Sequence, residues 1–207
     1  MYSTSTIPVV GDSVVGSHPE LAPLPGQRAR LLEAMVRAVA EKGYDAATVS
    51  DAVRLARVSR GTFYELFASK EACLLAAYRA GYEVLEQRIR EAVRGAADWR
   101  EELRLGFRAY LRTLEDDPLF ARVYLIEGHV VAEEREAVLH RYADRYARSF
   151  AKSGHPVPPF EALFVLAVGV HELACARVRQ GRGVLDLEQV LVSCAVRLAG
   201  DKEEPWT

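Results

Sequence analysis

The spacing of the apolar residues constrains this chain more than any other feature. From Gln27 onward they recur at every third or fourth position, in stretches that follow Ser, Thr, Asp or Pro and end near Gly. This period is that of an amphipathic α-helix, and no stretch shows the alternation of a strand between hairpin turns. The sequence therefore predicts an all-α fold of nine helices with short connections, three short helices first and six mostly longer ones after.

Capping residues give the expected helix boundaries. Residues that favour a helix start are Thr48, Ser59, Ser69, Asp98, Asp117-Pro118, Pro158-Pro159 and Asp186. Glycines that favour a helix end are Gly43, Gly95, Gly128, Gly154, Gly181 and Gly200. The sixth helix is thus expected over 117–128 and the seventh over about 131–152.

Composition excludes several classes of protein. Half of the 207 residues are hydrophobic and 27% are charged, which excludes wholesale disorder, and a net charge of −2 excludes a generally basic coat. Cys73, Cys175 and Cys194 form neither a disulfide framework nor a metal knuckle. No apolar run is long enough for a membrane span and no secretory signal is visible, so we expect a cytoplasmic protein with reduced thiols. Residues 1–26 hold four prolines and no Lys or Arg, and are expected to form a flexible tail.

Residues 48–70, TVSDAVRLARVSRGTFYELFASK, predict two short helices joined by a tight turn at Leu55–Val58. This is the helix-turn-helix arrangement, in which the second helix enters the major groove of DNA. The exposed start of that helix would carry Ser59, Arg60, Gly61, Thr62 and Tyr64. An ordinary helical hairpin with a solvated face has the same spacing, so the pattern alone leaves both interpretations open.

The residue types in this segment suit DNA. Arg60 can bind a guanine edge or a phosphate, Gly61 lets two backbones approach, and the hydroxyls of Thr62 and Tyr64 suit phosphates. At Lys70 a positive charge coincides with a helix start, which also suits a phosphate. Residues 27–70 contain eight Lys or Arg and five Asp or Glu, a net charge of +3 in a chain of net charge −2. Positive charge is therefore concentrated where a polyanion would dock.

These residues also carry a family resemblance. The pair TV at 48–49 and the string VSRGTFYELFASKE at 58–71 resemble the signature of the TetR (tetracycline-repressor) family of bacterial transcriptional regulators. The resemblance implies a homodimer whose C-terminal domain binds a small-molecule inducer and dimerises through the last two long helices. It implies phosphate contacts for Thr48, Thr62, Tyr64 and Lys70, and base contacts for Arg60 and Gly61. The expected domains are a helix-turn-helix DNA-binding domain over 27–71 and a ligand-binding and dimerisation domain over 72–207.

One position departs from the family pattern. Where the family usually has a glycine in the turn, this chain has Arg57. If the backbone there is left-handed, a non-glycine residue costs roughly 1–2 kcal/mol. A phosphate contact by Arg57 could offset this cost, so Arg57 joins Ser59 and the residues above as a predicted DNA contact.

The apolar residues of the C-terminal part follow helical spacing, which predicts that most of them form the hydrophobic core. Large rings with polar tips could also line an apolar cavity and hydrogen-bond a ligand. The predicted ligand-binding residues are Phe107, Tyr110, Leu111, Tyr124, Tyr142, Tyr146, Phe164 and His171. The ninth helix is apolar around much of its circumference, which indicates a partner surface shared with the eighth helix.

His171 and Cys175 form a near miss to the HExxH zinc helix, with cysteine at the second histidine position. A buried histidine beside a pocket or interface explains them better. No Ser-His-Asp order, P-loop or dinucleotide motif occurs, so neither an enzyme nor a cofactor is expected. The leading hypothesis is a repressor that releases a palindromic operator when a mostly apolar molecule binds. The alternatives are a small helical metalloprotein or enzyme centred on His171 and Cys175, and an interaction or carrier module that no longer binds DNA.

Overall fold

The computed structural model describes residues 26–200 and is α-helical through this range, which confirms the predicted fold class. The predicted tail lies outside the described residues, apart from Gly26. The helices are α1 (Gly26–Lys42), α2 (Val49–Ala56), α3 (Arg60–Leu66), α4 (Lys70–Ala92), α5 (Trp99–Asp116), α6 (Pro118–Ala121), η1 (Arg122–Ile126), η2 (Glu127–Val131), α7 (Ala132–Lys152), α8 (Phe160–Arg179) and α9 (Leu187–Leu198). None of the helices in this range combines the length and apolarity that crossing a bilayer requires.

Local capping chemistry sets most of these boundaries. The side chains of Thr48, Ser59, Ser69, Asp98 and Asp117 each accept a hydrogen bond from the backbone N–H three residues later. These bonds satisfy N–H groups that a helix start leaves without a partner. Thr48 and Asp51 form a capping box, with both reciprocal bonds present.

The ninth helix begins differently from the capped ones. Asp186 precedes α9 but makes no capping hydrogen bond. Its carboxylate lies 2.8 Å from Nη1 of Arg177, near the end of α8. An ion pair between the two ends of the α8–α9 connection thus replaces the cap.

The expected sixth helix over 117–128 is wrong in its length and in its end. Only Pro118–Ala121 is α-helical; a π-helical turn, η1, and a 3-10 segment, η2, follow and lead directly into α7. Gly128 lies inside η2 rather than at a helix end. Tyr124 of this segment makes tertiary contacts with α4: its ring stacks on that of Tyr78, with centroids 4.8 Å apart, and its hydroxyl donates to the Ala77 carbonyl.

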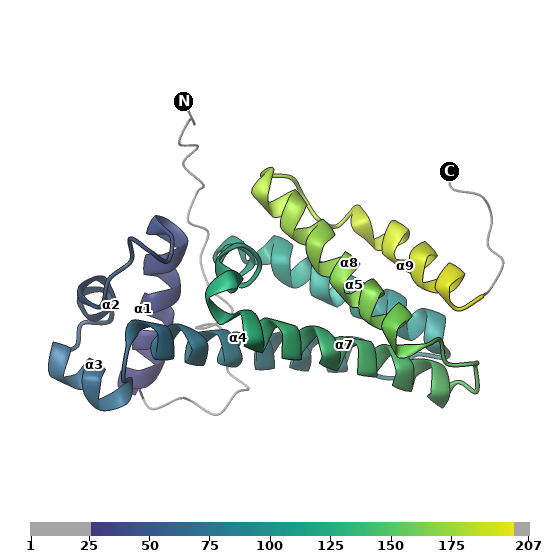
Figure 1. The fold of residues 1–207 in the computed structure, drawn as a ribbon, viewed down its shortest axis with the longest axis horizontal. Helices are drawn as coiled ribbons and strands as arrows, with labels where there is room; N and C mark the ends of the chain where they lie inside the picture. The colour runs from purple at the N-terminus through teal and green to yellow at the C-terminus, as the bar shows by residue number, and fades with distance from the viewer. Residues whose placement is uncertain (1–25, 201–207) are drawn as a thin grey trace.

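Helices α1–α3 form one end of the molecule, the head, and α4 leads from it into a body formed by α5–α9 (Figure 1). The body is layered: α5 contacts α4, α7 and α9, while α8 packs against α7. One buried core extends from Leu31 and Phe63 in the head through Cys73 of α4 to Leu191 of α9. Because α4 contributes to the core of both parts, it connects them mechanically.

Candidate nucleic-acid interface and internal cavity

The start of α3 points outward from the head. Phe63 is fully buried, with its ring 5.3 Å from that of Tyr64 and 5.7 Å from that of Phe67. This burial fixes the rotation of the helix and leaves Ser59, Arg60, Gly61 and Tyr64 exposed, with Thr62 half-buried. The Ser59 hydroxyl accepts from the Thr62 N–H at 2.9 Å, which secures the first turn. The helix therefore presents the predicted residues as one outward edge.

Arg60 and Gly61 give this edge its shape. The Arg60 guanidinium lies 3.3 Å from Oγ of Ser50 and 3.4 Å from the Tyr64 hydroxyl, so it is held along the helix surface. A Cβ at Gly61 would meet only Oγ of Ser59, at an ordinary 3.5 Å. Nothing within the described protein requires glycine here, so any requirement comes from what docks against the helix.

The turn before α3 contains the strained residue. Arg57 has φ 54° and ψ 48° and is the one non-glycine residue of 26–200 with a positive φ. Its backbone N–H donates to the Arg54 carbonyl at 3.3 Å, and that of Val58 donates to the Val53 carbonyl at 3.1 Å, which closes α2. The left-handed backbone considered for Arg57 is thus present, and the side chain is exposed beside α3.

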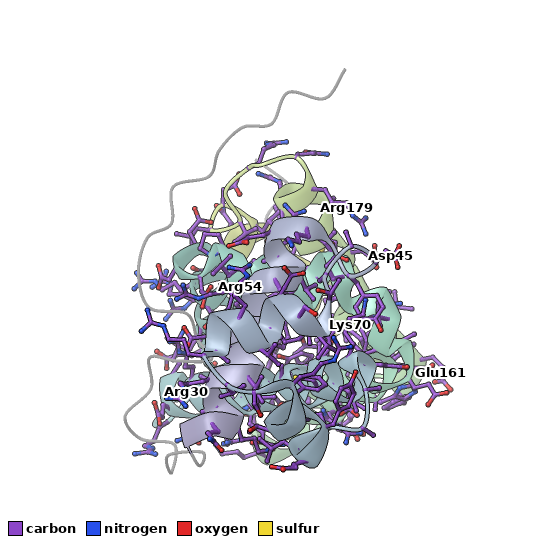
Figure 2. All side chains as sticks on the ribbon, turned by 90° about the vertical axis from the view of Figure 1, so that its left-hand side faces the viewer. Arg30, Asp45, Arg54, Lys70, Glu161 and Arg179 are labelled. Carbon is purple, nitrogen blue, oxygen red and sulfur yellow. The ribbon has the colours of Figure 1, made fainter. Side chains whose placement is uncertain are left out.

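Two of the predicted phosphate-binding residues also hold the head together. The Lys70 ammonium donates to the carbonyls of Tyr44 at 2.7 Å and Ala47 at 3.0 Å, and lies 3.9 Å from the Tyr44 ring centroid. Thr48 caps α2 and donates to Asp51 at 2.7 Å. Hydrogen bonds from Lys42 and Thr48 hold the pKa of Asp51 well below its usual range. Figure 2 views this end of the molecule, with Arg54 left of the centre of the face, Lys70 right of it and Arg30 at the lower left.

Residues 31–77, which include this edge, match the family model described as "Bacterial regulatory proteins, tetR family". Over this head region the chain thus resembles the TetR family. The HTH-type transcriptional activator FasR of Mycolicibacterium smegmatis is 29% identical over 116 residues, which cover 54% of this chain and 53% of that protein. The chain thus spans about half the length of this curated relative.

Solved structures of TetR-like regulators share the fold over most of the chain. The fatty acid degradation regulator FadR from Bacillus halodurans gives a TM-score of 0.76 at 21% identity, over 84% of this chain and 96% of that one. FadR from Bacillus subtilis, in complex with stearoyl-CoA, gives 0.70 at 21% identity, over 81% of this chain and 96% of that one. These likenesses extend the comparison from the head to the helical body.

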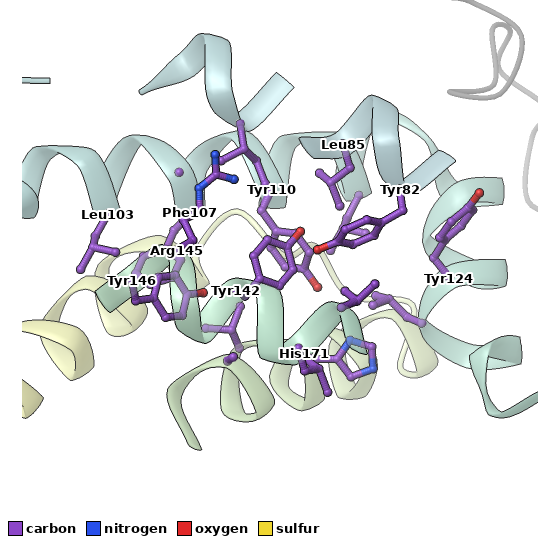
Figure 3. A pocket seen from close by; sticks show the side chains of 18 of the residues that line it. Tyr82, Leu85, Leu103, Phe107, Tyr110, Tyr124, Tyr142, Arg145, Tyr146 and His171 are labelled. Carbon is purple, nitrogen blue, oxygen red and sulfur yellow. The ribbon is translucent and has the colours of Figure 1, made fainter. Parts of the chain in front are cut away.

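The body encloses a cavity of about 60 Å³ between α4, α5, η1, α7 and α8 (Figure 3). Six of the eight predicted ligand-binding residues line it: Phe107, Tyr110, Tyr124, Tyr142, Tyr146 and His171. Leu111 and Phe164 lie outside the lining. Leu111 is fully buried in the core, and the Phe164 ring packs 4.5 Å from that of His140. Whether the six residues bind a ligand stays a prediction.

Sequence reasoning missed several lining residues, above all Tyr82, Arg145 and Ser149. The signal was present on α7, where Val138, Tyr142, Arg145 and Ser149 follow spacings of four, three and four. A search for apolar residues overlooks Arg145 and Ser149 on the cavity-facing side of α7, because polar side chains usually face solvent.

His171 and Cys175, which nearly match the zinc-binding HExxH pattern, form a compact group on α8. Ligand atoms of His171, Glu172 and Cys175 lie within 4.8 Å of one another, so Glu172 supplies the third group that the sequence did not indicate. However, the Cys175 thiol donates to the Leu125 carbonyl at 3.4 Å and lies 3.4 Å from Nε2 of His171. Burial raises the pKa of Cys175 to about 11 and lowers that of His171, whose imidazole also feels the charge of Arg135. The neutral Cys175 thiol thus ties α8 to η1, with the neutral ring of His171 beside it.

The segment 118–131 touches both the cavity and the head. The Tyr124 hydroxyl donates to the Ala77 carbonyl of α4, an approach that only the absence of a side chain at Gly81 permits. A few residues later, Oε2 of Glu127 accepts from the backbone N–H of Tyr44 at 3.1 Å. Tyr44 is the residue whose carbonyl Lys70 binds. One short segment therefore links the cavity lining to the head.

Exposed apolar side chains gather on the last two long helices. Val165 is 65% exposed and Leu173, two turns later on α8, is 42% exposed; Val190 on α9 is 40% exposed. Gly169 lies between the first two and has open space around its Cβ position. Such a stripe is typical of a surface that a partner covers.

Proposed function

We propose that this protein is a ligand-responsive transcriptional regulator, a repressor that binds a palindromic operator as a homodimer. The observation that carries the proposal is the outward edge of α3, where Arg60, Gly61 and Tyr64 are exposed while Phe63 is buried. A helix held in this way can enter a major groove, while the residues of the adjacent caps and turn contact phosphates. The match of residues 31–77 to the TetR-family model supports a regulatory rather than an enzymatic role.

DNA binding is tested with the full chain and a duplex from its own upstream region. Arg60→Ala and Tyr64→Ala are each expected to weaken binding by about 1–3 kcal/mol, the value of a good groove or phosphate contact. Glu65→Ala changes an exposed residue of the same helix and is not expected to weaken it. Affinity should also fall steeply with salt. Unchanged affinity in both α3 variants would refute the proposed interface.

The cavity supports the ligand response. At about 60 Å³ it is much smaller than the roughly 300–1,000 Å³ of typical ligand sites, so a ligand must move its walls apart. One wall is η1, which continues into the contact between Glu127 and Tyr44 of the head. Opening the cavity is therefore expected to shift the head and to weaken DNA binding through a coupling of about 1–3 kcal/mol. The similar FadR of B. subtilis forms a complex with stearoyl-CoA, which favours a ligand with a long apolar part.

The exposed stripe on α8 and α9 supports dimerisation through the last two helices. A two-fold axis there would pair four helices and present two α3 edges to one duplex. The direction of regulation is tested in cells, because the relative FasR is named an activator. Deletion of the gene should raise transcription from the bound promoter if the protein represses it.

A further inference from the structure

Four buried polar atoms in the cavity wall have no hydrogen-bond partner among the described residues. They are the hydroxyls of Tyr82 and Tyr142, Nη1 of Arg145 and Oγ of Ser149. Tyr82 and Ser149 are only 5% and 1% exposed. Buried polar groups are nearly always satisfied, and four exceptions around one cavity indicate that its occupant supplies the partners.

The four atoms belong to one region of the wall. Tyr142, Arg145 and Ser149 occupy successive turns of α7, and Tyr82 faces them from α4, with its ring 5.7 Å from that of Tyr142. Figure 3 shows Tyr82, Tyr142 and Arg145 around the same space. Tyr82 and Arg145 also line grooves on the outer surface between α4 and α7. The polar region is therefore the side of the cavity that faces outward.

Other parts of the wall are apolar. Leu85, Leu103, Phe107 and Leu125 are buried and line the cavity. An occupant must thus combine an apolar body with one polar end.

All four atoms can donate a hydrogen bond, and the hydroxyls of Tyr82 and Tyr142 also lie close enough to interact with each other. Arg145 carries a permanent charge and has no acceptor. Its nearest acid is Glu86, at 4.0 Å, and Glu86 already lies 3.1 Å from Arg90. Burial raises the pKa of Tyr82 and of Tyr142, so both hydroxyls keep their protons. The one acid among the described lining residues, Glu102, pairs with Lys152 at 3.5 Å.

We propose that the cavity takes an aliphatic carboxylic acid as its carboxylate, with the carboxylate bound by Arg145, Ser149, Tyr82 and Tyr142 and the chain lying along Leu103 and Phe107. A carboxylate accepts up to four hydrogen bonds and carries a negative charge that can pair with the Arg145 guanidinium. The assignment rests on the proposed function, since it names the effector class of the same cavity.

The test is calorimetric titration of the full chain with dodecanoate, dodecanol, methyl dodecanoate and dodecanoyl-coenzyme A. Dodecanoate should bind more tightly than the alcohol and the ester by about 10- to 100-fold, the factor expected for hydrogen bonds to a charged group. Equal binding of acid, alcohol and ester would overturn the proposal. Binding of the thioester without the free acid would overturn it as well, and would point to a carbonyl acceptor whose remaining groups lie in the outer groove.

Variants locate the carboxylate. Arg145→Leu should remove the preference for dodecanoate over dodecanol, whereas Arg148→Leu, an exposed arginine on the same helix, should keep it. Ser149→Ala and Tyr82→Phe should each weaken dodecanoate binding several-fold. Both should leave the melting temperature of the free protein unchanged or raised, because they remove groups without partners. A melting temperature clearly lowered in these two variants, with the ligand preference intact, would assign the groups to the fold instead.

DNA release in the same samples separates this inference from the regulatory function. If the protein binds its upstream DNA but dodecanoate neither binds nor releases it, the carboxylate assignment fails and the regulator stands. If dodecanoate binds through Arg145 while no DNA binding is found, the regulator fails and the carboxylate site stands.

Discussion

Arg57 has a backbone conformation that glycine adopts at lower cost. Its left-handed φ and ψ cost roughly 1–2 kcal/mol. Glycine removes this cost but adds about 0.5–1 kcal/mol of unfolded-state entropy. We predict that Arg57→Gly raises the free energy of unfolding by up to about 1 kcal/mol, measured by urea denaturation. If the exposed charge contacts a phosphate, the same variant should bind DNA less tightly and with a smaller salt dependence.

Arg57→Ala separates the two effects. Alanine keeps the left-handed cost and removes the charge, so it should lose as much DNA affinity as Arg57→Gly without the gain in stability. Full DNA affinity in both variants would show that Arg57 is retained for a reason other than DNA.

Gly61 gives a second prediction about a single residue. Because a Cβ would meet only Ser59 Oγ at 3.5 Å, Gly61→Ala should leave stability unchanged or raise it by up to about 1 kcal/mol. The added methyl group would nevertheless separate α3 from the bases, and we expect DNA affinity to fall about tenfold or more, or about 1.4 kcal/mol. Anisotropy titration against the same duplex measures this loss. An alanine variant with full affinity would place Gly61 away from the bases.

The segment 118–131 is the element that we expect to transmit the ligand signal. Its π-helical and 3-10 turns carry Tyr124 and Leu125 in the cavity wall and Glu127 against the head. We predict that Glu127→Ala retains DNA binding but reduces the fold-change in DNA affinity that a cavity ligand causes, because the contact with the Tyr44 N–H is lost. Glu127→Gln keeps an acceptor oxygen and should keep the response. An alanine variant with the full ligand response would exclude this route.

The same segment shows where sequence reasoning stops. Helix starts depend on neighbours three residues away, so Thr48, Ser59, Ser69, Asp98 and Asp117 could be identified as caps from the sequence alone. The π-helical turn depends on stacking within 118–131 and on the fit of Tyr124 against Gly81, a residue of another helix. Asp186 likewise pairs with Arg177 across a connection instead of capping α9. Contacts of this kind leave no periodic trace in a single sequence.

The two candidate sites differ in the same way, because one depends on neighbouring residues and the other on contacts between helices. The edge of α3 could be predicted because its residues are contiguous and only the burial of Phe63 sets their direction. Lys70 could be singled out as a cation, but its contacts with the carbonyls of Tyr44 and Ala47 depend on the fold of the α1–α2 connection. The aromatic part of the cavity followed from helical spacing, whereas Arg145 and Ser149 became visible as lining residues only with α4 facing α7.

The whole molecule works as proposed only if two copies bring their α3 edges to one duplex. We predict that Val165→Asp with Leu173→Asp yields a monomer in sedimentation experiments. Two buried carboxylates at a two-fold interface would face their symmetry copies, and burying unpaired charges is costly. Both side chains are exposed in the single chain, so the monomer's own stability should change by no more than about 0.5 kcal/mol per site.

The monomeric variant should bind a palindromic duplex only as tightly as a half-site, because the second head no longer benefits from the effective concentration that the dimer provides. Val157→Asp is the matched control: Val157 is 47% exposed but lies in the connection before α8. A variant that stays dimeric with both aspartates would move the interface away from α8. A variant that becomes monomeric yet keeps full affinity for the palindrome would instead show that each head binds DNA independently.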